Sequence, residues 1–181
     1  VAVDRAGGES EARVVVHVDN HAPELSLSDP EDGGFIREAL AVSGTVNDRF
    51  LKEYTLKLAG SACADAVNWS LLRTGDQPIQ DGPLAALQTL PPDGVYCLRL
   101  TAEDLIGNTA ARQIDFTIDT APPAPPILSG HLEAGTGVAL QWQGNSEPDL
   151  AGFNLYRNNF KINSVPIPGT EFLDEDLAAG T

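Results

Sequence analysis

Two cysteines, Cys63 and Cys97, are the first candidates for covalent chemistry in this sequence. Two cysteines alone do not supply the four ligands of a structural zinc site. They can form one disulfide, a bond that persists in oxidising compartments. The alternative is a pair of free thiols, one of them buried.

Acidic residues near expected strand ends and domain junctions are the candidates for binding a metal ion. They are Asp4, Asp19, Glu103, Asp104 and Asp119. Calcium takes six to eight oxygen ligands, which a junction between stacked domains can gather from several segments. The alternative is a set of solvated turns, in which Asp4 and Asp104 stabilise hairpins through side-chain to main-chain hydrogen bonds.

Trp69 is the candidate for a ligand-binding platform, because an indole ring can stack on a sugar. Carbohydrate is therefore a possible partner. The sequence has no His-Glu-x-x-His pair, Gly-x-Ser-x-Gly elbow or glycine-rich phosphate loop. These are local signatures of zinc proteases, α/β-hydrolases and nucleotide-binding proteins. The sequence thus predicts a protein that is not an enzyme, with no cofactor other than calcium.

Net charge narrows the classes of partner. The 181 residues include 11 Lys and Arg against 26 Asp and Glu, a formal charge of −15. Nucleic-acid binding requires a cationic face, and so does adsorption to an anionic membrane. No apolar run approaches the roughly 20 residues of a membrane-spanning helix. We therefore expect neither nucleic-acid binding nor membrane insertion.

The elements that must position these residues are short strands. The chain has 17 Gly, 13 Pro and no Met, and its apolar stretches alternate between turn signals, as all-β sandwiches require. Residues 21–120 contain seven expected strands: Glu24–Ser28, Leu40–Val46, Lys52–Ala59, Val67–Leu72, Leu84–Leu90, Val95–Ala102 and Arg112–Asp119. The long segment 73–92, which includes the strand expected at Leu84–Leu90, is the best candidate for a ligand-binding loop.

A repeat divides the chain into domains. Asp4 and Gly7 recur 100 residues later as Asp104 and Gly107, and the match continues through the following strand. About 100 residues is the size of one immunoglobulin-like sandwich. We therefore expect three parts: the last two strands of a sandwich in residues 1–20, a whole sandwich in 21–120, and a third domain in 121–181.

Residues 137–159, GVALQWQGNSEPDLAGFNLYRNN, resemble the fibronectin type III family of bacterial extracellular proteins. Residues 170–181, TEFLDEDLAAGT, resemble a later strand of the same family. The middle domain resembles bacterial immunoglobulin-like repeats through TAEDLIGNTA and FTIDTAPP. These resemblances imply tandem sandwiches in an extracellular or cell-surface location. Such a secreted-type fold favours the Cys63–Cys97 disulfide, lying across the outer surface because Tyr96 and Cys97 point to opposite faces.

A further resemblance concerns the junction at residues 18–25, VDNHAPEL, which is similar to the linker of cadherin-type repeats. That likeness implies calcium held by carboxylates and carbonyls. His21 stands where another oxygen ligand would help.

The fibronectin resemblance implies seven strands, of which residues 121–181 supply about five. We therefore expect an exposed core around Trp142, Phe153 and Leu155, and an unpaired edge on the strand Phe153–Arg157. One explanation is a segment of a long multidomain chain. The other is head-to-tail complementation, in which residues 1–18 of one copy complete the open domain of the next.

The expected function is a non-catalytic structural repeat: a rigid stalk, or a head-to-tail fibre, of a bacterial surface protein. Its partners would be adjacent domains or other copies of the chain. The alternative is an adhesin or a carbohydrate-binding accessory module of a secreted enzyme.

Overall fold

The structure is a computed structural model that describes residues 1–14, 19–133 and 137–175. It divides into two compact units, unit 1 (Val1–Thr120) and unit 2 (Ala121–Thr181). Strands dominate both, and within the described ranges the helical structure is one short 3-10 turn, η1 (Cys63–Asp65). No helix in these ranges is long and apolar enough to cross a membrane. The predicted all-β fold class is confirmed.

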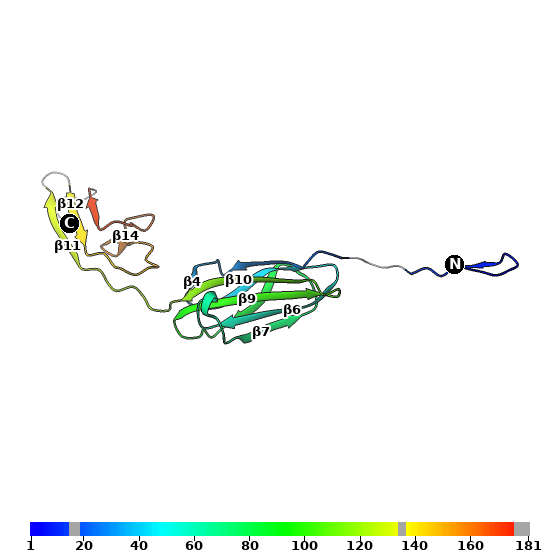
Figure 1. The fold of residues 1–181 in the computed structure, drawn as a ribbon. Helices are drawn as coiled ribbons and strands as arrows, with labels where there is room; N and C mark the ends of the chain where they lie inside the picture. Colours follow the sequence, from blue (N-terminus) through cyan, green and yellow to red (C-terminus); the bar gives the residue numbers. More distant parts are fainter. Residues whose placement is uncertain (15–18, 134–136, 176–181) are drawn as a thin grey trace. The chain divides into compact units, whose positions relative to one another are not determined.

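Unit 1 is built around a sandwich of two sheets (Figure 1). The larger sheet has the order β4 (Gly34–Ile36), β10 (Thr109–Ile118), β9 (Gly94–Asp104), β6 (Leu51–Ala59) and β7 (Ser70–Gly75). The smaller sheet has the order β3 (Glu24–Asp29), β5 (Leu40–Asn47) and β8 (Ile79–Leu87).

Alternating side chains form the core between the two sheets. On β9, Tyr96, Leu98 and Leu100 are buried, as the period of two predicts. They belong to one apolar cluster with Val42 of β5 and Leu84 of β8. The Tyr96 hydroxyl also donates a hydrogen bond of 2.6 Å to the carbonyl oxygen of Pro92, which fixes the entry into β9.

Two parts of unit 1 differ from the sequence expectation. The expected loop at residues 73–92 contains all of β8, which begins at Ile79 rather than Leu84. Pro83 interrupts the pattern, but β8 is the edge strand of its sheet, where proline costs no ladder hydrogen bond on the open side. The short β4 was not expected; it pairs in parallel with β10 and is too short for a periodic signal.

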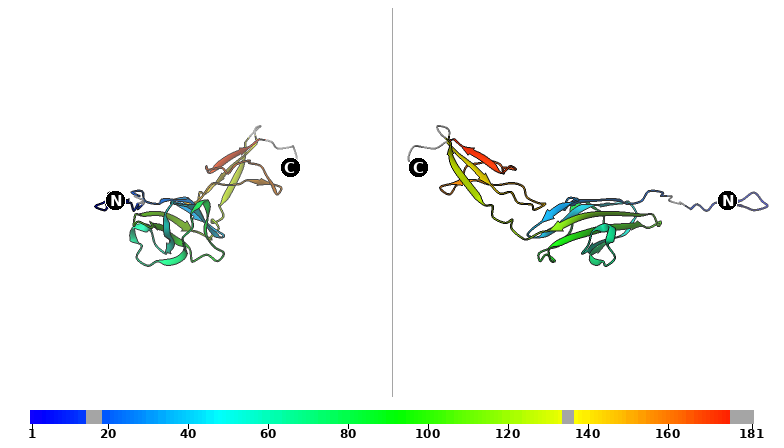
Figure 2. Two further views of the ribbon diagram at one scale, coloured as in Figure 1. Left: turned by 90° about the vertical axis from the view of Figure 1, so that its right-hand side faces the viewer. Right: turned by 60° about the vertical axis from the view of Figure 1, so that its left-hand side comes forward.

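Unit 2 contains a three-stranded sheet of β11 (Leu128–Glu133), β12 (Gly137–Trp142) and β15 (Glu171–Asp174). These strands lie side by side in Figure 2. A two-residue turn joins β13 (Tyr156–Arg157) to β14 (Phe160–Lys161). The expected exposure of the core is wrong: Trp142, Phe153 and Leu155 are only 6%, 8% and 9% exposed, because the segments around β13–β14 fold over β12.

A separate small hairpin precedes the sandwich of unit 1. It consists of β1 (Ala2–Val3) and β2 (Glu9–Ser10), and all of its described side chains through Val14 are exposed. The strand expected to continue through residues 15–18 lies outside the described residues, as do residues 176–181 of the fibronectin-like motif.

Candidate functional site

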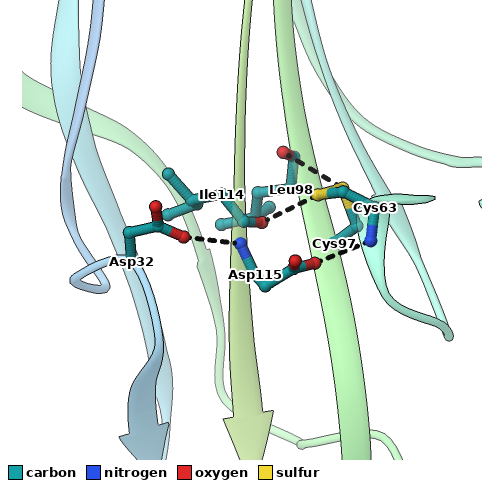
Figure 3. The surroundings of a disulfide bond; sticks show 6 residues. All are labelled: Asp32, Cys63, Cys97, Leu98, Ile114 and Asp115. Carbon is teal, nitrogen blue, oxygen red and sulfur yellow. Dashed lines mark hydrogen bonds between the residues drawn. A yellow bond between two sulfur atoms is a disulfide. The ribbon is translucent and has the colours of Figure 1, made fainter.

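The disulfide joins Cys63 to Cys97 and places a loop on the outer face of the larger sheet (Figure 3). The chain leaves β6 at Ala59, which is paired with Cys97 of β9, and turns back through η1 so that Cys63 lies over its partner. The two Cα atoms are 4.9 Å apart and 34 positions apart in sequence. The bond therefore links the end of β6 to the start of β9, the two segments that the sequence indicated.

Asp115 of β10 holds the same loop. Its carboxylate accepts a hydrogen bond of 2.7 Å from the main-chain N–H of Cys63, and its own N–H donates to Asp32 at 3.0 Å (Figure 3). Cys97 points away from the core, as predicted, but it does not lie on the open surface. It is completely buried, because the disulfide loop covers it. We call this arrangement of Cys63, Cys97 and Asp115 the disulfide cap.

The turn between β9 and β10 is organised by a buried carboxylate, Asp104. Its Oδ1 accepts hydrogen bonds from the main-chain N–H groups of Ile106, Gly107 and Asn108, at 2.6–2.8 Å. The Asn108 side chain donates to its Oδ2 at 2.8 Å. Burial acts to raise the pKa of Asp104, but the hydrogen bonds from Asn108, Ile106 and Gly107 outweigh it and hold the pKa below its ordinary value.

Two further carboxylates meet Asp104 at this end of the sandwich. Oxygen atoms of Asp19, Asp48 and Asp104 lie within 4.8 Å of one another. Asp19 also accepts, through its main-chain carbonyl, a hydrogen bond of 3.1 Å from Asn108. Each carboxylate has one oxygen already engaged by main-chain N–H groups, Asp48 through Phe50 and Asp19 through His21. The second oxygens of Asp19 and Asp48 are the ones that a cation can use most directly, since both oxygens of Asp104 already accept hydrogen bonds.

The structure thus brings together two of the five predicted ligands, Asp19 and Asp104, and adds Asp48. The strand pairing accounts for this addition, since Leu51 at the start of β6 is paired with Asp104 at the end of β9. The turn at Asn47-Asp48, which precedes β6, therefore lies next to the turn that follows β9. Knowing that these strands pair would have identified Asp48 from the sequence.

The other three predicted ligands lie elsewhere. Glu103 faces outward and forms an ion pair of 2.7 Å with Lys52. Asp119 follows the opposite end of β10, where its N–H donates to the carbonyl oxygen of Ile36. Asp4 organises the first hairpin, in which its Oδ1 accepts from the N–H groups of Ala6 and Gly8.

Trp69 precedes β7 and is partly buried. The guanidinium carbon of Arg99 lies 5.7 Å from its ring centroid, so that a cation covers the aromatic surface. Arg99, Thr55 and Thr101 also line a shallow hollow of about 440 Å³ on the outer face of the sheet. The two threonine hydroxyls are hydrogen-bonded to each other at 2.7 Å.

Unit 2 has an apolar groove of about 250 Å³, lined in part by Leu140, Trp142, Phe153 and Leu155. The rings of Trp142 and Phe153 meet edge to face, with centroids 5.4 Å apart. The buried Nε1 of Trp142 has no hydrogen-bond acceptor among the described residues. The groove borders the segment Phe153–Arg157 that the sequence indicated as an open edge.

Comparison with known proteins gives two partial relatives, and no family model matches the chain. Bacillopeptidase F of Bacillus subtilis is 27% identical over 158 residues, which are 82% of this chain and 10% of that protein. The poly(3-hydroxybutyrate) depolymerase of Delftia acidovorans is 34% identical over 61 residues, 34% of this chain and 12% of that protein. The chain thus spans about a tenth of the length of these curated relatives.

Among solved structures, the crystal structure of an engineered protein matches with a TM-score of 0.38 and 19% identity. The match covers 54% of this chain and 20% of that one.

Proposed function

We infer that this chain is a non-catalytic, extracellular spacer that holds neighbouring parts of a larger bacterial protein apart. The observation that carries this proposal is the connector between the units. At its start, Thr120 donates two hydrogen bonds to the Asp93 carboxylate of unit 1, at 2.8 and 3.2 Å. At its end, Ala124 is held by Glu147 at 3.0 Å and by Asn145 at 2.6 Å, both of unit 2.

Between these anchored ends lie only residues 121–123, and Pro122 and Pro123 have fixed φ angles. A connector of this kind limits bending, which is what a spacer needs. The extracellular setting is supported by the disulfide, because structural disulfides persist in oxidising compartments. The two relatives are both named as enzymes, which favours a spacer within a secreted enzyme over a fibre subunit.

The test is a measurement of stiffness. Two fluorophores, one on each unit, would report the distance distribution between the units by single-molecule energy transfer. We expect a narrow distribution for the wild type and a broader one for the double variant Pro122→Gly, Pro123→Gly. The matched control, Pro166→Gly and Pro168→Gly within unit 2, should leave the width unchanged. A wild-type distribution as broad as that of the glycine variant would contradict the spacer function.

A binding module is a second candidate, favoured by the hollow on the outer sheet face that Arg99 lines while its guanidinium stacks on Trp69. Its ligand would be a carbohydrate with hydroxyls for Thr55 and Thr101, and Trp69 would act by positioning Arg99. Binding on a glycan array that disappears in Trp69→Ala, and persists in Trp142→Phe as a control in unit 2, would support it. If the wild-type chain retains no glycan on the array, the binding-module proposal is wrong.

The sequence predicted a calcium site, and we propose it at Asp19, Asp48 and Asp104. Asp48 takes the place of Asp4, Glu103 and Asp119, which lie elsewhere. It is favoured by the mutual approach of these carboxylates within 4.8 Å. Isothermal titration with calcium should give heat that Asp48→Asn abolishes and Glu103→Gln leaves intact. Absence of heat in the wild type would end the proposal.

A further inference from the structure

Two cations lie side by side on the outer face of the larger sheet. Lys57 of β6 and Arg99 of β9 are directly opposite each other in the strand ladder, and the alternation of both strands points them away from the core. Like charges in this position repel each other, because directly opposite Cβ atoms are only about 5 Å apart. A bound anion would therefore stabilise the pair.

Carboxylates of the described residues do not neutralise this pair, although the chain has 26 acidic residues against 11 basic ones. Neither Lys57 nor Arg99 takes part in a salt bridge with them. The carboxylates that neighbour the pair in register are engaged elsewhere. Asp115 accepts the hydrogen bond from the N–H of Cys63 at 2.7 Å, and Glu103 forms its ion pair with Lys52.

Trp69 positions the guanidinium of Arg99 over this part of the sheet. The residue lies just before β7, which is separated from β9 by β6. Since the guanidinium carbon is 5.7 Å from the ring centroid, the Arg99 side chain reaches across β6, the strand that carries Lys57. Stacking uses the flat face of the guanidinium and leaves the N–H groups at its edge to donate to an acceptor.

The hollow of about 440 Å³ continues from these cations along the two strands. Three successive opposite pairs of β6 and β9 follow one another there: Lys57–Arg99, Thr55–Thr101 and Glu53–Glu103. Each pair is two residues from the next, which is about 7 Å along a strand. In the middle pair one hydroxyl donates to the other at 2.7 Å, so that one hydroxyl hydrogen remains for a ligand. The hollow thus has cations at one end, hydroxyls in the middle and carboxylate acceptors at the other end.

We propose that this hollow binds a saccharide that carries a carboxylate, such as a short chain of uronic acid units. The carboxylate would accept charge-assisted hydrogen bonds from Arg99 and Lys57, and sugar hydroxyls would bond to Thr55, Thr101 and Glu53. A nucleic acid fits this site poorly, because the net charge of −15 repels a chain of phosphates. The inference rests on the binding-module candidate, whose ligand class it names, and it is independent of the spacer function.

The test is an NMR titration of the full chain with trigalacturonate. The matched ligand is its methyl ester, which keeps the sugar hydroxyls and has no charge. We expect the acid form to shift the amide signals of Thr55 and Thr101 with a dissociation constant on the order of 1 mM, and the ester to bind about tenfold more weakly.

Variants of the chain locate the binding. Arg99→Gln and Lys57→Gln should each weaken binding of the acid form about tenfold, because each removes one charge-assisted contact. Arg112→Gln is the matched control: it removes an exposed cation of β10 that does not line the hollow, and it should bind like the wild type.

Three outcomes would overturn the proposal. Equal binding of acid and ester would mean that the carboxylate is not recognised, and the binding-module candidate would stand without it. Acid binding that persists in Arg99→Gln would mean that the ligand lies elsewhere. Inorganic sulfate that shifts the same signals at the same concentration would mean that the cations take any anion and that the saccharide has no part. If the wild type binds neither form, the proposal is also wrong, and the glycan array alone then decides on the binding module.

Discussion

The first hairpin and the β9–β10 hairpin have the same turn in opposite surroundings. In both, an aspartate Oδ1 accepts hydrogen bonds from the following N–H groups, and a glycine three residues on has positive φ, +86° at Gly7 and +100° at Gly107. The aspartate N–H also donates across the turn, at 2.9 Å to Gly8 and 3.0 Å to Asn108. Positive φ costs glycine little, so both turns form from local sequence.

The strands that leave these turns differ greatly. β9 and β10 are 11 and 10 residues long, whereas β1 and β2 have two residues each. β9 has β6 on its other side and a core beneath it, whereas β1 pairs with β2 within the described residues. Burial of alternate side chains between two sheets adds to the stability that the turn gives β9 and β10.

The largest expected effect comes from removing the disulfide cap, which β9 has and β1 lacks. Replacing both Cys63 and Cys97 by serine should destabilise unit 1 by about 4 kcal/mol, from the entropy of a loop of this length. Urea unfolding monitored through hydrogen exchange in β9 would measure it. The first hairpin should exchange at the same rate with or without the bond, and a change there would contradict its independence from the sandwich of unit 1.

Ile114 and Val14 occupy equivalent positions 100 residues apart, one 2% and the other 84% exposed. Ile114→Ala should cost about 3 kcal/mol, because it leaves a cavity in the core. Val14→Ala should change the stability of dilute protein by less than about 0.5 kcal/mol. Urea titration of both variants makes this comparison. Equal losses would mean that the first hairpin is packed in solution.

Asp104 and Asp4 are equivalent turn residues of the two hairpins, one buried and the other exposed. Asp104→Asn should lower the melting temperature of unit 1, because a buried carboxylate and its charge-assisted hydrogen bonds to three N–H groups are lost. Asp4→Asn, at an exposed turn, should leave it unchanged. Calorimetry of the two variants at neutral pH would measure the difference.

The same pair predicts a pH dependence. The pKa of folded Asp104 lies below its ordinary value of 3.8, so its ionised form favours folding. Its stabilisation is complete above that ordinary value and disappears as pH falls through the lower, folded pKa. As the pH falls below the ordinary value of 3.8, Asp104→Asn should therefore lose less stability than the wild type does. If the stability of Asp104→Asn falls with pH as steeply as that of the wild type, this prediction is wrong.

Asn108 provides the smallest effect. Its side chain donates to Asp104 and to the carbonyl of Asp19, whereas Gly8 at the equivalent position has no side chain. Asn108→Ala should cost about 1–2 kcal/mol, the value of two hydrogen bonds. Accelerated exchange of the Ile106 amide would locate the loss, and unchanged exchange would mean that the main-chain bonds alone hold the turn.

Local periodicity predicted the strands of unit 1 where one face is buried. Tyr54, Leu56 and Leu58 alternate in β6 as expected, and all three are buried. β8 was placed too late, because Pro83 and Gly82 resemble a loop when the edge position of the strand is unknown. Edge strands tolerate residues that central strands exclude.

The candidate sites depended on contacts between distant segments, and there the sequence was less informative. Asp104 and Asp19 were found because they lie at recognisable strand ends, whereas Asp48 required the pairing of β6 with β9. Predicting that Cys97 is buried would have required knowing the path of the disulfide loop. Such features arise from tertiary packing, which the periodicity of a single strand does not encode.

The Cys63–Cys97 bond also determines how far unit 1 can lengthen under mechanical load. When the sandwich is pulled apart from its two ends, the 34-residue stretch closed by the bond cannot straighten. An extended chain covers about 3.3–3.6 Å per residue, so about 110–120 Å of contour is withheld. Under shear flow or surface traction, an oxidised chain would therefore yield in shorter steps than a reduced one.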